Sequence, residues 1–456
     1  MEDFLYKFSA RNDGIFEDSG RRPQFFIRTY GCQMNDRDSE MLSGMLLQMG
    51  YEKAGVEDEA ELILYNTCCV RERAENKIFG HLSRLKSRKA QEKGLLIVVC
   101  GCMTQQEGVA QTIATTHKYV DVVLGTGNRH RLPEFLWRRI ETGKTVIDIN
   151  EGDGEVFEDT PVTVRDYSHK AGVNIMTGCD NFCSFCIVPY VRGREKSRDG
   201  SDILREIQAL GDDGVKEIML LGQNVNSYGG GEFHNLLRQV NDVPGLMRIR
   251  FMTSHPRDFS DEIIGAVRDL DKVCKSVHLP LQSGSSRILT DMNRGYSKEQ
   301  YLGLIERLRA EVPGVAVTTD IIVGYPGETE EDFLETLDVV RQARFDGAFM
   351  FIYSKRSGTP AAERTDLVPR TVSAERFERL TQTVYPILLE RNEALVGRVV
   401  DVMVEENEAG KDGLFKGRAD DGTLVHFACS RAVSAGKILG VRIESAKTFY
   451  VVGEGI

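Results

Sequence analysis

The first part of the chain with a regular hydrophobic pattern runs from Gln24 to about Asn150. Short apolar runs alternate there with longer stretches in which apolar residues recur with the helical period of about 3.6 residues. This βαβ alternation is typical of an open, mostly parallel sheet with helices on its faces. The predicted strands of this part are 25–30, 62–65, 95–99, 120–124 and 146–149.

The same alternation resumes on a larger scale between residue 173 and about residue 391. The predicted strands are 173–176, 217–221, 247–252, 276–279, 316–323 and 348–353. Amphipathic helices are predicted between them, for example at 202–210, 298–311 and 330–343. Six β/α units predict a partial barrel related to the eight-fold β/α barrel, whose chemistry lies at the carboxyl ends of the strands.

From about Leu395 the pattern changes to short alternating runs broken by Gly, Asp and Asn. The predicted strands are 397–404, 414–419, 424–427, 438–445 and 448–451. Five such strands predict a small all-β barrel, a fold that often binds oligonucleotides. We expect the aromatic residues Phe415, Phe427 and Phe449 to lie in its core rather than on a stacking surface.

Together these patterns predict an α/β multidomain protein. Residues 1–22 have no clear period and are predicted to be a loosely held tail, and the acidic segment 151–164 is predicted to be a linker. The predicted folded domains are an open parallel α/β sheet at 23–150, a partial (β/α)6 barrel at 165–388 and a small β-barrel at 389–456.

Composition narrows the class of protein. With 41% hydrophobic and 28% charged residues, the chain is typical of a soluble globular protein. No apolar run reaches the length of a membrane span and the N-terminus does not resemble a secretory signal, so we expect a cytoplasmic protein with no membrane partner. The ten cysteines then predict metal or redox chemistry rather than disulfide bonds.

The strongest chemical signal is the C-x3-C-x2-C loop formed by Cys179, Cys183 and Cys186. Three thiolates this close can hold one iron–sulfur cluster, and because the next cysteine downstream is Cys274, one iron would stay open for a substrate. Zinc is the alternative, but its usual paired C-x2-C ligands fit this spacing poorly. The loop therefore predicts a cluster with an open coordination position.

A second set of cysteines follows the predicted strands of the N-terminal sheet. Cys32 follows the first strand, the pair 68–69 follows the second, and the run 100–102 follows the third. Since the carboxyl ends of parallel strands share one edge, these thiols are predicted to converge on a second three-thiolate cluster. The alternative is that they are buried apolar cysteines. Spacing does not choose between Cys68 and Cys69, or between Cys100 and Cys102.

Charge gives a weaker signal. The net charge of −11 argues slightly against a nucleic-acid partner, although local basic patches, rather than the sum, meet phosphates. Three basic clusters occur: Arg84, Lys86, Arg88 and Lys89; Arg129, His130 and Arg131; Arg192, Arg194, Lys196 and Arg198. The third cluster directly follows the cysteine loop, which favours a contact between it and a phosphate backbone.

The chain after residue 22 resembles the radical S-adenosylmethionine (SAM) methylthiotransferases. Besides the C-x3-C-x2-C loop, the matching stretches are TYGCQMN (29–35), NTC (66–68), GC (101–102), PYVRG (189–193), LGQNVN (221–226), TSHP (253–256), QSGS (282–285), GYPGET (324–329) and GTPA (358–361). The resemblance implies a methylthiotransferase N-terminal domain, a radical-SAM core and a C-terminal TRAM domain that binds RNA.

The resemblance also implies two 4Fe-4S clusters, with Cys32, Cys68 and Cys102 as ligands of an auxiliary cluster. Cys179, Cys183 and Cys186 would then bind the cluster that holds SAM, and two molecules of SAM would be used per turnover, as methyl donor and as radical source. The residues predicted to bind SAM lie mainly at the ends of the central strands: Gly222, Gln223, Asn224, Ser254, His278, Gln282, Arg294, Asp320 and Tyr353.

The implied activity is a tRNA modification. The motif variants at 33–35 and 222–226 favour methylthiolation at C2 of N6-dimethylallyladenosine beside the anticodon. One alternative substrate is threonylcarbamoyl-adenosine in tRNA, and an alternative of another class is a non-catalytic, metal-stabilised RNA-binding protein. The implied partners are a tRNA anticodon stem-loop and an electron donor of the flavodoxin or ferredoxin type, and a monomer is the default expectation.

Overall fold

The computed structural model describes residues 2–69, 72–106, 108–149 and 164–456. Almost all of the predicted linker 151–164 lies outside these residues. The chain divides into two compact units. Unit 1 comprises Met1–Asp166, Thr177–Asp180 and Ile187–Arg198, and unit 2 comprises Tyr167–Met176, Asn181–Cys186 and Asp199–Ile456.

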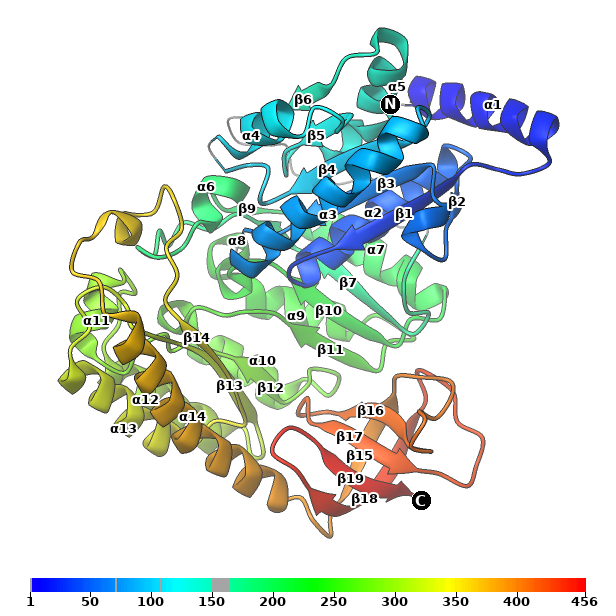
Figure 1. Ribbon diagram of the computed structural model, residues 1–456. Helices are drawn as coiled ribbons and strands as arrows, with labels where there is room; N and C mark the ends of the chain where they lie inside the picture. The colour runs from blue at the N-terminus through cyan, green and yellow to red at the C-terminus, as the bar shows by residue number, and fades with distance from the viewer. Residues whose placement is uncertain (1, 70–71, 107, 150–163) are drawn as a thin grey trace. The chain divides into compact units, whose positions relative to one another are not determined.

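Unit 1 is built on a six-stranded parallel sheet with the strand order β2-β1-β3-β4-β5-β6 (Figure 1). Its strands are β1 (Gln24–Thr29), β2 (Glu52–Lys53), β3 (Leu62–Thr67), β4 (Leu96–Gly101), β5 (Val122–Leu124) and β6 (Val146–Asp148). Every residue of β3 is buried, because a central parallel strand is covered on both faces. The predicted parallel sheet is confirmed, with β2 as an additional edge strand.

Helices cover the sheet of unit 1 and complete two apolar cores. They are α1 (Glu2–Ser19), α2 (Gln33–Gln48), α3 (Glu72–Gln91), α4 (Val109–Thr116) and α5 (Leu132–Thr142). Unit 1 also contains α6 (Val188–Arg192), which packs through Val191 with Cys69 and Cys102, and the 3-10 turns Glu57–Glu59 and Arg129–Arg131. Successive residues of β3 serve different cores: Leu64 packs with Leu42 of α2, whereas Ile63 packs with Leu82 of α3. This alternation follows from strand geometry, in which neighbouring side chains point to opposite faces.

The prediction of a loosely held N-terminal tail is wrong. Residues 2–19 form helix α1, whose Phe8 is fully buried and meets Trp137 of α5 edge to face at 5.3 Å between ring centroids. Asn12 is buried as well, and its Nδ2 donates a hydrogen bond to the Met49 carbonyl at 2.9 Å. Because these two are the only fully buried residues of the helix, no apolar period marks it in the sequence.

The larger part of unit 2 is a partial barrel of six parallel strands in two groups of three, ordered β11-β10-β7 and β12-β13-β14. A β-bridge between Ile249 and Val273 connects the groups. The strands are β7 (Lys170–Asn174), β10 (Glu217–Leu221), β11 (Arg248–Phe251), β12 (Ser276–His278), β13 (Ala316–Val323) and β14 (Gly347–Ile352). The six predicted β/α units are confirmed. The two-residue strands β8 (Met176–Thr177) and β9 (Lys196–Ser197) flank the C-x3-C-x2-C loop in the sequence.

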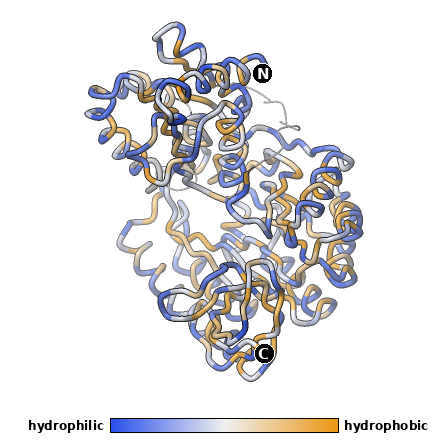
Figure 2. Tube along the Cα trace, turned by 90° about the vertical axis from the view of Figure 1, so that its right-hand side faces the viewer, coloured by the Kyte–Doolittle hydropathy of each residue, from blue (hydrophilic) through white to orange (hydrophobic). Residues whose placement is uncertain are grey.

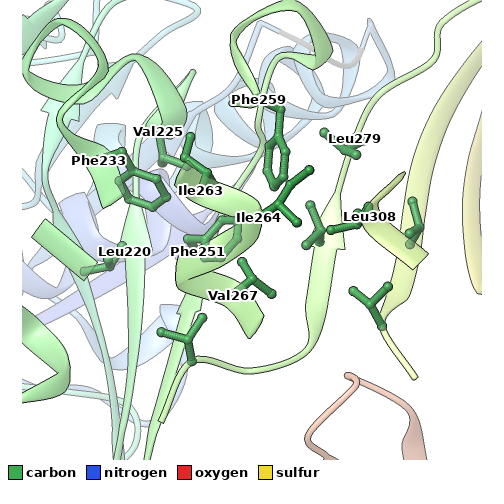
Figure 3. Packing of buried hydrophobic residues seen from close by; sticks show 14 of the residues in the cluster. Leu220, Val225, Phe233, Phe251, Phe259, Ile263, Ile264, Val267, Leu279 and Leu308 are labelled. Carbon is green, nitrogen blue, oxygen red and sulfur yellow. The ribbon is translucent and has the colours of Figure 1, made fainter. Parts of the chain in front are cut away.

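Helices pack on the outer face of this barrel. They are α7 (Gly200–Asp212), α8 (Tyr228–Gly231), α9 (Phe233–Asn241), α10 (Asp261–Asp269), α11 (Ser286–Asp291), α12 (Lys298–Glu311), α13 (Glu330–Ala343) and α14 (Arg370–Glu393). Capping boxes fix the starts of α12 and α13, both of which have the predicted bounds. Figure 3 shows Ile263, Ile264 and Val267 of α10 beside Phe251 of β11 in the core. Figure 2 shows hydrophobic and hydrophilic residues alternating along the trace, as amphipathic elements require.

The C-terminal part of unit 2 is a closed five-stranded barrel with the order β15-β16-β17-β19-β18 (Figure 1). Its strands are β15 (Val399–Val404), β16 (Phe415–Ala419), β17 (Leu424–Ala428), β18 (Ile438–Ala446) and β19 (Val451–Gly455). Phe427 is fully buried and stacks on Phe415, as predicted. The prediction that Phe449 lies in the core is wrong, because this side chain is 61% exposed and touches Tyr385 of α14.

The small barrel is fastened to the partial barrel by two arginines of β11. Arg248 donates hydrogen bonds to the carbonyl oxygens of Asp401 and Arg418, at 2.8 and 2.7 Å. Arg250 donates to the carbonyl oxygens of residues 419 and 420 at 2.8 and 3.0 Å. Helix α14 runs across the predicted domain boundary at 388/389. The small barrel is therefore packed against the core of unit 2 rather than tethered to it.

Candidate functional site

The structure brings the three cysteines of the N-terminal sheet to one edge. Cys32, Cys68 and Cys102 follow β1, β3 and β4, which are adjacent parallel strands. The backbone N–H of Cys102 donates to the Thr67 carbonyl at 3.0 Å, and a Cβ added to Gly31 would lie 3.0 Å from the Cys68 Cβ. The strand ends thus hold the cysteine-bearing turns against one another.

Gly101 makes the approach of these turns possible. It has a left-handed φ of +102°, and a Cβ at this position would collide with the backbone carbonyl of Thr67. Only glycine adopts such a φ without strain and leaves this space empty. The GC pair at 101–102 therefore has a structural cause: glycine lets the chain turn sharply and places Cys102 beside the neighbouring strand end.

The two additional thiols of this edge have different surroundings. Cys100 points into the apolar core on one face of the sheet, and burial raises its pKa to about 12. Cys69 is also fully buried, but its thiol lies against Cys102. The hydrogen bond from Cys69 lowers the pKa of Cys102 to about 6; burial opposes this shift, and the charge of Arg192 adds to it. Cys102 is thus favoured as a thiolate, the form that binds metals.

A buried charged network lies next to Cys102 within unit 1. Arg192 donates from Nε to the Cys102 Sγ at 3.3 Å and from Nη2 to Asp38 Oδ2 at 3.0 Å and Asn35 Oδ1 at 3.1 Å. Arg129 holds the other carboxylate oxygen of Asp38 at 3.0 Å. The Asp38 side chain is fully buried, and that of Arg192 is 5% exposed. The Arg192 charge therefore faces the predicted cluster ligands, without competition from water.

This network corrects the expectation for two residues of the basic clusters. Arg192 heads the cluster that was expected to contact phosphates, but its side chain is buried and bonded to Asp38. Arg129, in the second cluster, is likewise turned inward. Asp38 was not identified from the sequence. Its signal was its position three residues after Asn35, which puts two polar side chains on the same, buried side of α2.

The C-x3-C-x2-C loop is shared between the two units. In unit 1, the Cys179 N–H donates to the Gly193 carbonyl at 3.2 Å. In unit 2, the Cys186 N–H donates to the Cys183 carbonyl at 2.9 Å, and Arg294 Nη1 donates to the Cys183 Sγ at 3.4 Å. Phe182 has a left-handed φ of +44°, a strained conformation for a side chain of this size.

Arg294 resembles Arg192 in its environment. It is buried, and besides Cys183 its guanidinium donates to the Pro280 carbonyl at 3.0 Å and to the Tyr296 hydroxyl at 3.1 Å. Each unit therefore places one buried guanidinium on one predicted cluster ligand. These contacts do not include a carboxylate, so the predicted role of Arg294 in SAM binding stays a prediction.

Most of the other predicted SAM-binding residues lie where the strands of unit 2 end. Gly222 and Gln223 follow β10, and Asn224 is buried with its Oδ1 accepting the His255 N–H at 3.0 Å. Ser254 follows β11, and its N–H donates to the carbonyl of His278, the last residue of β12, at 3.2 Å. Hydrogen bonds thus link the loop after β10 to the loop after β11, and the loop after β11 to the end of β12.

The remaining predicted SAM-binding residues lie on or after β12, β13 and β14. His278 Nδ1 is 2.8 Å from Thr318 Oγ1, and its Nε2 is 3.5 Å from Asp320 Oδ2. The backbone of Gln282 accepts the N–H of Ile322 at 2.8 Å and donates to the Asp320 carbonyl at 2.8 Å. Tyr353 continues the register just beyond β14, with its N–H bonded to the Val323 carbonyl at 2.9 Å.

Several buried polar atoms at these strand ends fit a bound polar ligand. Among the residues that the structure describes, Ser254 Oγ, His255 Nε2 and Tyr353 Oη are buried without a hydrogen-bond partner. Burial, with the charges of Arg294 and Arg257, lowers the pKa of His255 to about 2, so its imidazole is neutral. Its Nδ1 accepts the Arg257 N–H at 3.3 Å, so Nε2 carries the proton and can donate to a ligand.

The donor set fits iron–sulfur clusters. In the described parts of the chain, no three His, Cys, Asp or Glu side chains form a group that could hold a single metal ion. Cysteines at separate strand ends, with arginines donating to their sulfur atoms, suit an anionic iron–sulfur cluster.

No described helix is both long and apolar enough to cross a membrane.

Comparisons with known proteins agree with this architecture. The model of the Radical SAM superfamily matches residues 173–340, and that of Uncharacterized protein family UPF0004 matches residues 24–125. The chain is 49% identical over 440 residues to a tRNA-2-methylthio-N(6)-dimethylallyladenosine synthase of Acetivibrio thermocellus, covering 95% of this chain and 91% of that one. A synthase of the same name from Clostridium tetani is 48% identical over 447 residues, covering 97% and 98%.

A solved structure shows a similar fold at low sequence identity. It is the radical S-adenosylmethionine methyltransferase TsrM from Kitasatospora setae, whose structure has cobalamin and a 4Fe-4S cluster bound. The two chains superpose with a TM-score of 0.56 at 14% identity, with 74% of each chain covered. At this identity the likeness shows the fold alone.

Proposed function

The chain belongs to the family of tRNA-2-methylthio-N(6)-dimethylallyladenosine synthases, and on that premise we propose that it is a radical-SAM methylthiotransferase acting on tRNA. Its reaction replaces the hydrogen at C2 of N6-dimethylallyladenosine by a methylthio group. This C–H bond is strong and has no useful acidity, so acid–base catalysis by side chains does not suffice and cofactors must carry the step.

The observation that carries the proposal is the second set of cysteines. A radical enzyme that only removes hydrogen needs one cluster, whereas inserting sulfur needs a sulfur source as well. Unit 1 provides three thiols at adjoining strand ends in addition to the C-x3-C-x2-C loop. We assign the auxiliary 4Fe-4S cluster to Cys32, Cys68 and Cys102, and the SAM-binding 4Fe-4S cluster to Cys179, Cys183 and Cys186.

When bound, these clusters and two molecules of SAM would supply the electron, the radical, the sulfur and the methyl group. The protein's own part is to hold and polarise them. Arg192 and Arg294 each donate a hydrogen bond to a ligand sulfur, which favours the more negative, reduced state of a cluster. Ser254, His255 and Tyr353 present the buried polar atoms that SAM can satisfy.

The proposal includes partners. The substrate is the anticodon stem-loop of a tRNA, and the small barrel is of the type that binds RNA. The modified adenosine must leave its stack to reach the inside of a barrel. An electron donor of the flavodoxin or ferredoxin type would reduce the clusters, and we expect the protein to act in the cytoplasm as a monomer.

Reconstituted protein tests this function directly. Iron and sulfide are measured first, and about eight irons with matching sulfide are expected for two four-iron clusters. The protein is then incubated with SAM, a reductant and a stem-loop RNA that carries N6-dimethylallyladenosine. Nucleoside mass spectrometry should find the 2-methylthio product with the wild type and none with Cys102→Ala or Cys183→Ala. Zinc without sulfide would instead identify a metal-stabilised RNA-binding protein.

A second RNA tests the substrate. The same stem-loop with threonylcarbamoyl-adenosine should give no methylthio product, because the relatives that match nearly the whole chain are named for the dimethylallyl substrate. Methylthiolation of this RNA alone would overturn the substrate while leaving the reaction class in place. Neither alternative function is favoured by an observation on the chain.

A further inference from the structure

The inner face of the second half of the partial barrel carries exposed aromatic side chains. On β13, Thr319, Ile321 and Val323 are buried, the last two in the core shared with α12 and α13. Residues 318, 320 and 322, on the other face of the strand, are only half-buried. That face is therefore the inner, open side of the sheet.

Phe349 and Phe351 lie on this inner face. In the parallel register of β13 and β14, Asp320 pairs with Phe349 and Ile322 pairs with Phe351, and paired residues share a face. Phe349 is 60% exposed and Phe351 is 43% exposed. Exposed aromatic side chains inside a barrel, rather than on its outside, indicate a surface that another molecule covers.

Polar groups flank this aromatic surface on one side. The His278 ring meets the Phe349 ring edge to face, with 6.0 Å between centroids. His278 is in turn bonded to Thr318 and lies 3.5 Å from Asp320. A flat heterocycle placed on Phe349 would therefore have hydrogen-bonding groups at its edge and an apolar surface beneath and beyond it.

We propose that Phe349 and Phe351 form the binding surface for the dimethylallyl-bearing adenine of the RNA substrate: Phe349 stacks on the base, and Phe351 packs against the dimethylallyl group and determines the specificity for it. This inference rests on the proposed function. The substrate named for the family combines a flat base with an apolar five-carbon group, and β14 offers both a stacking ring and a further apolar ring, Phe351, two residues along the same face. An unmodified adenine would leave that second ring exposed, which gives the site a reason to prefer the prenylated base.

Binding measurements on the cluster-loaded enzyme test this inference. Two stem-loop RNAs are compared that differ only in the dimethylallyl group, and the affinity for SAM is measured separately. We expect the wild type to prefer the prenylated RNA by about tenfold or more, and Phe351→Ala to reduce that preference to about twofold. Phe349→Ala should weaken the binding of both RNAs and leave the preference nearly unchanged, because both carry the adenine on which this ring stacks. Affinity for SAM should stay at the wild-type value in both alanine variants, and Phe351→Leu, which keeps an apolar side chain, should retain most of the preference.

The control is Ile352→Ala on the same strand. Ile352 is also exposed, at 39%, but strand alternation points it to the opposite face from Phe349 and Phe351, so its loss should not change the preference. Because Phe349 and Phe351 are both exposed, the two alanine variants should unfold at about the same urea concentration as the wild type.

Failure of this inference is distinguishable from failure of the function. If the wild type methylthiolates the prenylated RNA but Phe351→Ala keeps the full preference, or Phe349→Ala binds both RNAs as tightly as the wild type, the inference is overturned and the function stands. A loss of SAM affinity in either alanine variant without the expected change in RNA binding would assign the aromatic surface to the cofactor and also overturn it. If the wild type forms no methylthio product on the prenylated RNA, the proposed function fails and the inference falls with it.

Discussion

Replacing Arg192 by glutamine removes a buried guanidinium that the structure places between a carboxylate and a cysteine. Its hydrogen-bond partners are Cys102 Sγ at 3.3 Å, Asn35 Oδ1 at 3.1 Å and Asp38 Oδ2 at 3.0 Å. Glutamine is shorter and uncharged, so it cannot keep all three contacts or the charge. The change therefore tests whether this arginine stabilises unit 1 and whether it sets the properties of the auxiliary cluster.

Two magnitudes follow from the geometry. Removing one partner of a buried ion pair costs about 3–5 kcal/mol, because the other charge is left without compensation. Asp38 keeps Arg129 at 3.0 Å, so we expect a smaller loss of about 2–3 kcal/mol in the unfolding free energy of the metal-free protein. A cluster that loses about 1–2 kcal/mol of preferential stabilisation of its reduced state shifts its one-electron potential downward by about 40–90 mV.

Both effects can be measured separately. Trp137 is the only tryptophan of the chain and belongs to α5, so its fluorescence in urea follows unit 1. The potential is measured by a redox titration followed by electron paramagnetic resonance, in a Cys183→Ala background that lacks the SAM-binding cluster. The matched control is Arg194→Gln, two residues along the chain, whose side chain is 62% exposed and should change stability by less than about 0.5 kcal/mol.

The reasoning would be refuted by an Arg192→Gln protein that behaves like the control in both measurements. A loss of stability with an unchanged potential would show that Arg192 has only a structural role. A lower potential with unchanged stability would show that Asp38 is fully compensated by Arg129 alone, and that the Cys102 contact is the one that matters.

Two further variants test other contacts of the structure. Arg250→Met removes two hydrogen bonds to backbone carbonyls of the small barrel and leaves the buried Glu217 without its partner at 2.9 Å. The unfolding free energy of unit 2 should therefore fall by about 3–5 kcal/mol. In limited proteolysis, the variant should be cut sooner than the wild type near the end of α14. Cys69→Ala removes the hydrogen bond that lowers the pKa of Cys102. In the metal-free variant, the thiolate of Cys102 should therefore form at a pH above about 6. Ultraviolet difference absorbance measures this titration.

Each of these two predictions has a result that would contradict it. Arg442→Met, on an exposed position of β18, serves as the control for Arg250→Met, and equal protease sensitivity of the two would show that the arginine does not fasten the barrel. For Cys69→Ala, an unchanged titration of Cys102 would mean that the positive charge of Arg192 alone holds the thiolate. The iron content should stay near that of the wild type, because Cys69 is not assigned as a ligand.

The sequence pattern predicted the parts of the fold in which local and global requirements agree. Strand β3 begins with a continuous apolar run because it is covered on both faces, and in β13 buried residues alternate with half-buried ones from Val317 onward because one face is open. Helices α12 and α13 carry capping boxes that mark their starts. Helix α1 was not predicted, because only Phe8 and Asn12 of its eighteen residues are buried. A helix with so small an apolar face has no period to detect.

The site could be predicted only as far as its cysteines. Their spacing and their place after strands show in the sequence, whereas the buried network around Asp38 depends on contacts between residues 91 and 154 positions apart in the chain. Arginine and aspartate residues usually indicate positions exposed to solvent, so the sequence around Arg192 does not show that this side chain is buried. The same holds for Phe349, whose exposure on the inner face of a barrel follows from strand register and not from composition.

The fate of the arginines also bears on how RNA is recognised. Two arginines of the predicted basic clusters, Arg129 and Arg192, are turned inward and form ion pairs with Asp38. Arg248 and Arg250 of β11 donate hydrogen bonds to carbonyl oxygens of the small barrel. These four guanidinium groups are therefore not free to meet a phosphate backbone, and the net charge of −11 gives no overall attraction to one. Phosphate groups are also the same in every RNA, so charge alone does not distinguish one base from another. Selection of the substrate base therefore needs contacts at short range, by shape and by stacking, which is the kind of contact that an exposed ring such as Phe349 can make.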